Sequence, residues 1–127
     1  MITGRVTAFG EALIPLSVRG GQGDERPVEA VIDTGFTGML TLPPILINEL
    51  GLFWRRRGRA LLADGGETVF DIYEATILWD GTPRRVAVDA VECAPLVGMS
   101  MLRGYEMTMQ IVEGGHVVIR SMASAAI

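Results

Sequence analysis

The chain has 127 residues, a length that predicts one domain spanning residues 1–127, and its 49% hydrophobic content favours a packed core over disorder. No apolar run reaches the ~18 residues of a membrane-spanning helix, and a net charge of −4 at pH 7 argues against nucleic acid as a partner, because phosphate binding needs a basic surface. The single cysteine excludes an internal disulfide, and Met1–Arg5 lacks the pattern of a signal peptide, so we expect a cytoplasmic protein without membrane contact.

Apolar residues alternate with polar ones or form short runs between turn signals, a pattern typical of an all-β fold. In the first half of the chain this pattern predicts strands at Thr3–Phe9, Ala12–Val18, Val28–Asp33 and Met39–Leu42. A solvated loop is expected at Gly20–Glu25. The segment Pro43–Gly51 begins with proline and ends with glycine, which predicts a helix of about two turns.

The second half is predicted to form hairpins. Strands at Phe53–Leu62 and Thr68–Leu78 flank the turn Ala63-Asp64-Gly65-Gly66, and the turn Asp80-Gly81 leads into a strand at Arg85–Val91. The last pair of strands is expected at Met107–Val112 and His116–Arg120, around Gly114-Gly115. The small, apolar tail Ser121–Ile127 is either frayed or part of an interface.

One segment points to chemistry. The apolar strand ending at Ile32 runs directly into Asp33-Thr34-Gly35, followed by Phe36-Thr37-Gly38. Asp-Thr-Gly alone is a weak signal, but here it places a carboxylate at a strand end, beside a glycine that lets backbone or ligand approach closely. The other interpretation of Asp33 is a strand-end aspartate that caps a turn.

This segment is similar to the active-site signature of the aspartic proteases, and two further features of that family follow in order. The glycine-tipped hairpin at Asp64, Gly65 and Gly66 occupies the place of the substrate-covering flap. The residues Leu96, Val97 and Gly98 then open a short helix that runs to Leu102. With one Asp-Thr-Gly in a short chain, the resemblance is to the single-domain, retropepsin-like enzymes, most closely to small prokaryotic members.

The resemblance implies an all-β, retropepsin-like closed barrel with one or two short helices, assembled as a homodimer. It further implies an aspartic endopeptidase in which Asp33 of each chain activates a water molecule to hydrolyse a peptide or protein substrate. Thr34 would brace the dimer across its two-fold axis, Gly35 would offer its backbone to the substrate, and Asp64, Gly65 and Gly66 would close over it.

A dimer also follows from the chemistry, because peptide hydrolysis needs both a proton acceptor and a proton donor. A lone aspartate with a pKa near ~3.9 is ionised at neutral pH and cannot be both. Two carboxylates ~3 Å apart repel by about 5 kcal/mol at an effective dielectric constant of ~20, so one of them stays protonated. Such sharing of a proton is the known behaviour of aspartic-protease dyads, and the pair titrates as a unit.

The sequence departs from the retroviral pattern in one coherent way. Phe36 and Thr37 stand where retroviral enzymes usually have a small residue and an acid, and Met99 stands where they commonly have the arginine that pairs with that acid. Both partners of one ion pair are therefore absent together, which leaves no stranded charge. Two alternatives to a protease remain: a catalytically inactive module of this fold that binds peptides or a partner protein, and one component of a larger assembly.

The remaining candidate residues favour structural interpretations. The arginine-rich stretch Trp54–Arg59 is interpreted as an exposed strand, with selection of acidic substrates as its functional alternative. His116 is the only histidine and is expected in a strand, while Cys93 is expected to be a buried or half-buried apolar residue. One histidine and one cysteine are too few to favour a histidine-based metal site or a Cys-His pair. We expect no metal and no organic cofactor.

Overall fold

The computed structural model describes residues 1–122 and is mostly β-sheet with two helices, as the sequence predicts. Residues 123–127, most of the tail for which the sequence left two interpretations, lie outside the described residues. The strands and helices along the chain are β1 (Ile2–Val6), β2 (Ala12–Arg19), β3 (Glu25–Ile32), β4 (Leu40–Leu42), α1 (Pro44–Leu50), β5 (Phe53–Leu61), β6 (Glu67–Trp79), β7 (Thr82–Ala90), β8 (Leu96–Val97), α2 (Met99–Leu102), β9 (Tyr105–Met109) and β10 (His116–Ser121).

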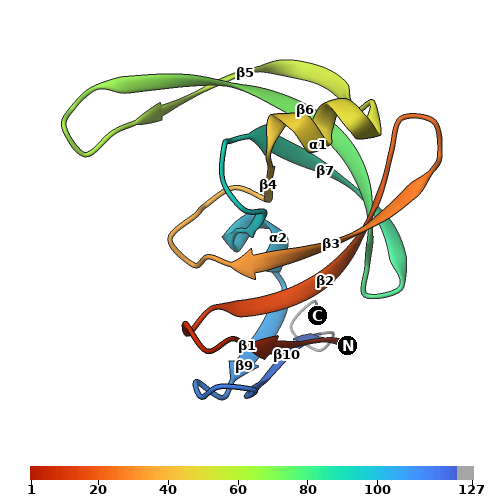
Figure 1. Ribbon diagram of the computed structural model, residues 1–127, viewed down its shortest axis with the longest axis vertical. Coiled ribbons are helices and arrows are strands. Elements are labelled where there is room, and N and C mark those ends of the chain that lie inside the picture. The colour runs from red at the N-terminus through yellow and green to blue at the C-terminus, as the bar shows by residue number, and fades with distance from the viewer. Residues whose placement is uncertain (123–127) are drawn as a thin grey trace.

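All ten strands belong to one sheet, in the order β5-β6-β7-β4-β8-β3-β2-β1-β10-β9 (Figure 1). Two of the pairings, β3 with β8 and β4 with β7, are parallel, and the others are antiparallel. Strand β2 also pairs with β6, so that the pairings of six strands (β6, β7, β4, β8, β3 and β2) return to the strand where they began.

The core forms because one face of each central strand is apolar. In β2, Ala12, Ile14, Leu16 and Val18 are buried while the residues between them are more exposed, which is the period-two pattern of a half-buried strand. The same alternation continues in β7 and β10. These faces enclose a continuous apolar cluster to which α1 and α2 also contribute.

Helix α1 follows the predicted capping pattern. Pro44 occupies its first turn, where a missing N–H is harmless, and Gly51 ends it in the left-handed conformation with φ of 61°. Ile47 and Leu50 of this helix are buried in the core, and Leu46 is partly buried against it.

The hairpins predicted around Asp80-Gly81 and Asp64–Gly66 are present and differ in their surroundings. The turn between β6 and β7 has Asp80 and Gly81 at φ of 52° and 81°, as a tight hairpin requires. The hairpin of β5 and β6 extends well beyond the rest of the molecule as a two-stranded arm (Figure 1). It is two-stranded because β7 pairs with β6 only from Ile72 onward, whereas β5 pairs with β6 from Glu67.

Two predicted strands continue too far toward the C-terminus. The first ends at Val6 rather than Phe9, because Thr7–Gly10 forms a turn in which the Gly10 N–H donates to the Thr7 carbonyl (3.0 Å). The strand predicted at Met107–Val112 is instead Tyr105–Met109. Within residues 1–122, neither helix has the length and apolar character needed to cross a membrane.

Candidate functional site

Asp33 lies immediately after β3, where the backbone is still held by its parallel neighbour. The Val31 N–H donates to the Pro95 carbonyl and the Asp33 N–H to the Val97 carbonyl, both at 2.9 Å. The apolar run of β3 thus delivers Asp33 to the end of a strand whose position is fixed by β8.

The side chain of Asp33 shapes the turn that follows. Its Oδ1 accepts a hydrogen bond from the Gly35 N–H (2.9 Å), and its carbonyl accepts one from the Phe36 N–H (3.1 Å). The turn-capping interpretation of Asp33 is therefore correct as far as Oδ1 is concerned. The side chain remains partly exposed, and Thr34 and Gly35 are exposed at the surface beside it.

Gly98 packs against the loop that follows Asp33 and, with the next two residues, holds it by backbone hydrogen bonds. The Gly98 N–H donates to the Met39 carbonyl (3.0 Å), and the next two N–H groups, of Met99 and Ser100, donate to the Phe36 and Gly38 carbonyls (2.8 and 3.1 Å). A Cβ atom at position 98 would lie 2.3 Å from the Gly38 carbonyl oxygen, so only glycine fits. The segment Leu96, Val97 and Gly98 thus meets the Asp33 loop. It also opens a short helix, α2, as the sequence predicts.

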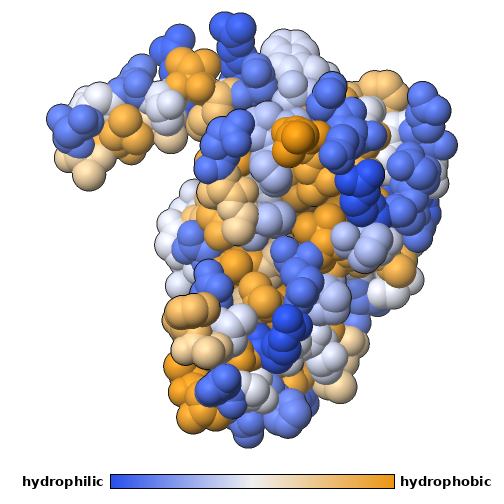
Figure 2. All heavy atoms as spheres, in the orientation of Figure 1, coloured by the Kyte–Doolittle hydropathy of each residue, from blue (hydrophilic) through white to orange (hydrophobic). Residues whose placement is uncertain are grey.

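A cleft of about 870 Å³ separates this loop from the arm. Its floor includes Asp33, Gly35 and Leu96, while the shaft of the arm contributes residues from Arg59–Leu61 and Thr68–Phe70. The space-filling view shows the surface hollowed beneath the arm (Figure 2). The aspartate and the hairpin, which are far apart in the sequence, therefore border one cavity.

The predicted tip residues lie at the end of the arm and do not line the cleft as it stands. The tip is a tight turn in which the Leu62 N–H donates to the Gly66 carbonyl (2.7 Å) and the Gly66 N–H to Asp64 Oδ1 (2.8 Å). Gly65 has φ of 86°, a conformation that favours glycine. Thr34, Val97 and Gly98 are likewise outside the cleft lining, the last two because they are buried.

The cleft also holds residues that the sequence analysis missed, above all Asp89 near the end of β7. Burial raises the pKa of Asp89, and the positive charge of Arg56 opposes that rise. Thr41 also borders the cleft, and its buried hydroxyl accepts a hydrogen bond from the Leu96 N–H (2.9 Å). The alternation of β7 places Asp89 out of phase with the core residues Val86 and Val88, but no local pattern in the sequence indicates that this face lines a cleft.

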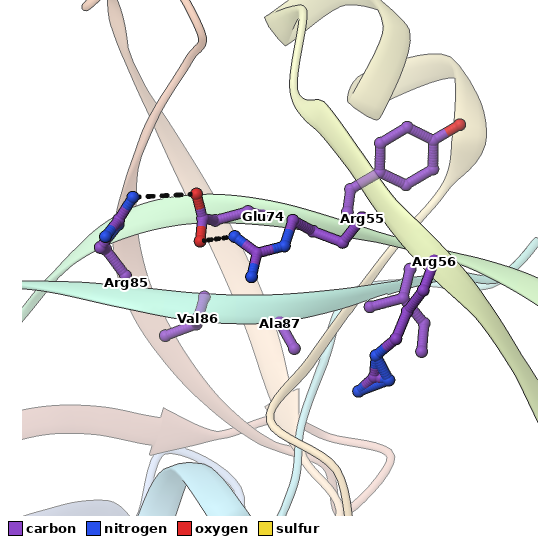
Figure 3. Close-up of a pocket in the computed structure, with 8 residues that line it drawn as sticks. Arg55, Arg56, Glu74, Arg85, Val86 and Ala87 are labelled. Atoms are coloured by element: carbon purple, nitrogen blue, oxygen red, sulfur yellow. Dashed lines mark hydrogen bonds and ion pairs between the residues drawn. The ribbon is translucent and has the colours of Figure 1, made fainter.

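A second, smaller hollow of about 170 Å³ lies where β5, β6 and β7 meet, away from Asp33. There Glu74 accepts hydrogen bonds from Arg55 (2.6 Å) and Arg85 (3.4 Å), as Figure 3 shows. Arg57 also faces a carboxylate, at 3.7 Å from Asp71. The arginine-rich stretch is thus an exposed strand, as predicted. Two of its arginines, Arg55 and Arg57, are ion-paired, and such surface pairs contribute at most ~1 kcal/mol each.

Cys93 and His116 are not part of the cleft lining. His116 is in strand β10, as expected. The prediction that Cys93 is buried or half-buried is wrong, because it lies in the exposed loop between β7 and β8. Loops between strands generally run over the surface, because water there satisfies their backbone polar groups.

No protein-family model matches the chain, and no curated protein matches it. Among residues 1–122, the histidine, cysteine and acidic side chains form no group of three that could hold a metal ion. The site is therefore interpreted from its geometry: a strand-end carboxylate, a glycine-braced loop and a projecting hairpin around one cleft.

Proposed function

We propose that this chain is a retropepsin-like aspartic endopeptidase that works as a homodimer, with one active site formed by Asp33 of both protomers. The observation that carries the proposal is the cleft that has Asp33 on its floor and the shaft of the β5–β6 arm on its opposite wall. In this reading the cleft holds an extended peptide, and the arm closes over it.

The backbone arrangement supports the retropepsin-like barrel. The ring of pairings through β6, β7, β4, β8, β3 and β2 is what a closed barrel of this family needs. Helix α2 begins directly after Gly98, whose lack of a side chain allows the contact with Gly38. Both features place the Asp-Thr-Gly turn on a rigid base, which acid–base chemistry requires for its geometry.

The single Asp33 explains why two copies are needed. One protomer offers one carboxylate in this loop, but hydrolysis requires a base to take a proton from water and an acid to protonate the carbonyl oxygen. Two Asp33 carboxyl groups brought together would share one proton and supply both functions. Because Thr34 and Gly35 are exposed beside Asp33, this surface is free to meet a second copy.

The dimer would be held without the ion pair of the retroviral enzymes. Met99, at the position of their arginine, is 47% exposed, and Phe36 packs within reach of Gly38 and Gly98. An apolar contact between protomers around Met99 would replace the missing charges.

The test compares Asp33→Asn with Asp24→Asn, which makes the same chemical change in the exposed turn between β2 and β3. We expect Asp33→Asn to reduce cleavage of a peptide library by ~10²–10⁴ or more while the protein remains dimeric, because an amide cannot accept the proton from water. Asp24→Asn should cleave at the wild-type rate. Sedimentation velocity reports the oligomeric state of each variant.

Unchanged proteolysis by Asp33→Asn, after removal of contaminating proteases, would overturn the proposal, as would a wild-type protein that is a monomer at all concentrations. A wild-type dimer that binds a statine-containing peptide without cleaving any substrate would instead identify the inactive, peptide-binding module.

A further inference from the structure

Asp89 occupies a defined place in the wall of the cleft. Its neighbours across the sheet are Thr41 on β4 and Ile72 on β6, and Arg56 on β5 lies next in the same row. Side chains in register on neighbouring strands share a face of the sheet. Within this row Thr41 and Asp89 line the cleft, whereas Ile72 and Arg56 line the smaller hollow. The position of Asp89 is therefore fixed by three strands rather than by a loop.

The carboxylate of Asp89 is about half-buried and has no close partner. Within residues 1–122 it makes no hydrogen bond or ion pair, and the charge of Arg56 acts on it only from a distance. Phe36, Phe70 and Leu96 make other parts of the cleft wall apolar. A partly desolvated carboxylate in such surroundings gains most from a cationic ligand group, which would replace its lost hydration.

The charged residues that line the cleft also favour a cationic ligand group. Asp33, Asp89 and Glu92 contribute carboxylates, whereas Arg59 is the one basic residue of the lining within the described chain. Two other arginines of β5, Arg55 and Arg57, form ion pairs with Glu74 and Asp71. The cleft is thus more acidic than the arginine-rich strand beside it suggests.

We propose that Asp89 is a specificity-determining residue that selects peptide substrates carrying a lysine or arginine side chain near the scissile bond. The inference rests on the proposed protease function, and it deepens that function by naming the substrate class. This preference for basic substrates is the opposite of the selection of acidic substrates that the arginine-rich stretch alone would indicate.

The test uses matched peptides in which lysine, norleucine or glutamate is placed in turn at each position around the scissile bond. At one position we expect wild type to show a kcat/KM about tenfold higher for lysine than for norleucine, as one charge-assisted contact provides. In Asp89→Asn this ratio should fall to about one, chiefly through a higher KM for the lysine peptide. The control Glu113→Gln, which removes an exposed charge from the β9–β10 loop, should keep the wild-type ratio.

A structural role of Asp89 would not produce a charge-specific change, and Asp89→Glu provides a second check because it restores the charge. We expect Asp89→Glu to recover part of the preference for lysine. Lowering the pH should also weaken the preference in wild type as Asp89 becomes protonated. Asp33, Glu92, Arg56 and Arg59 are the other charged groups around the cleft, so the part of the pH effect that belongs to Asp89 is the part lost in Asp89→Asn.

Equal cleavage of the lysine and norleucine peptides by wild type, at every position, would overturn the inference while leaving the protease proposal intact. A preference for lysine that persists in Asp89→Asn would overturn it as well. If wild type cleaves no peptide, the proposed function fails, and the Kd values of wild type and Asp89→Asn for the same peptides then decide the charge selection separately.

Discussion

Two segments border the cleft and are held in place in different ways. The Asp33 loop is fixed by backbone hydrogen bonds to β8 and to the start of α2, and Gly98 behind it is buried. The outer part of the arm has only the ladder between β5 and β6, and its side chains from Leu61 to Val69 are exposed. Because a two-stranded ribbon is marginally stable by itself, we expect the loop to be rigid and the arm to move.

This difference is what the proposed hydrolytic site would require of its two sides. The groups that move protons must hold their geometry in the absence of substrate, whereas a cover must open to admit the peptide. The comparison can be tested by disturbing each side in turn.

The largest effect is expected from Gly98→Ala. Its Cβ would lie 2.3 Å from the Gly38 carbonyl oxygen and 2.7 Å from that of Phe36, both backbone atoms that cannot move aside cheaply. We expect a loss of about 3 kcal/mol in the free energy of unfolding, at the upper end of overpacking costs, measured by urea denaturation.

Gly65→Ala is the matched substitution at the tip of the arm. A Cβ there meets no atom within 4 Å, so the cost comes only from φ of 86° and should be about 1 kcal/mol, confined to the turn. Equal destabilisation by the two alanines would contradict the view that the loop is braced and the arm is free.

Both sides of the cleft leave local patterns in the sequence. The apolar strand before Asp33 and the glycine of Leu96-Val97-Gly98 are local patterns, and each marks a position where a strand ends or a backbone approaches closely. The arm was equally visible, because the turn at Asp64–Gly66 separates two long strand patterns.

Asp89 and Thr41 escaped prediction because their role depends on a parallel pairing between β4 and β7, which are separated by the entire β5–β6 hairpin. Nothing local in the sequence specifies that register. The exposure of Cys93 was missed for a related reason, since small apolar residues in a loop of unknown path resemble core residues. The closed barrel and the dimer remain predictions.

A smaller effect, on function alone, is expected from Leu61→Ser in the shaft of the arm. Leu61 lines the cleft yet is 77% exposed, so the free energy of unfolding should change by no more than about 0.5 kcal/mol. If the arm covers a bound peptide, KM should rise by roughly threefold to tenfold, because the apolar contact with the peptide is lost.

Leu78→Ser is the control for this substitution, because Leu78 is also exposed on β6 but lies outside the cleft lining. Its KM should equal that of wild type. A KM that is unaffected by Leu61→Ser would indicate that the arm does not close over the peptide.

The smallest effect, on thermal stability, is expected from Asp89→Asn. Asp89 lies between the two segments, because it pairs with Thr41 of β4 on one side and with Ile72 of β6, a strand of the arm, on the other. Burial raises the pKa of Asp89 above its ordinary value, which means that folding disfavours the ionised form. This penalty is absent below the ordinary pKa of an aspartate and appears as the pH rises through the raised pKa of the folded protein. Asp89→Asn, which carries no charge, should therefore raise Tm slightly at neutral pH and leave it unchanged in acid, as thermal denaturation across a pH series would measure. A lower Tm at neutral pH would instead mean that the ionised Asp89 is stabilised in the free protein, which would leave no unmet charge for a basic substrate to satisfy.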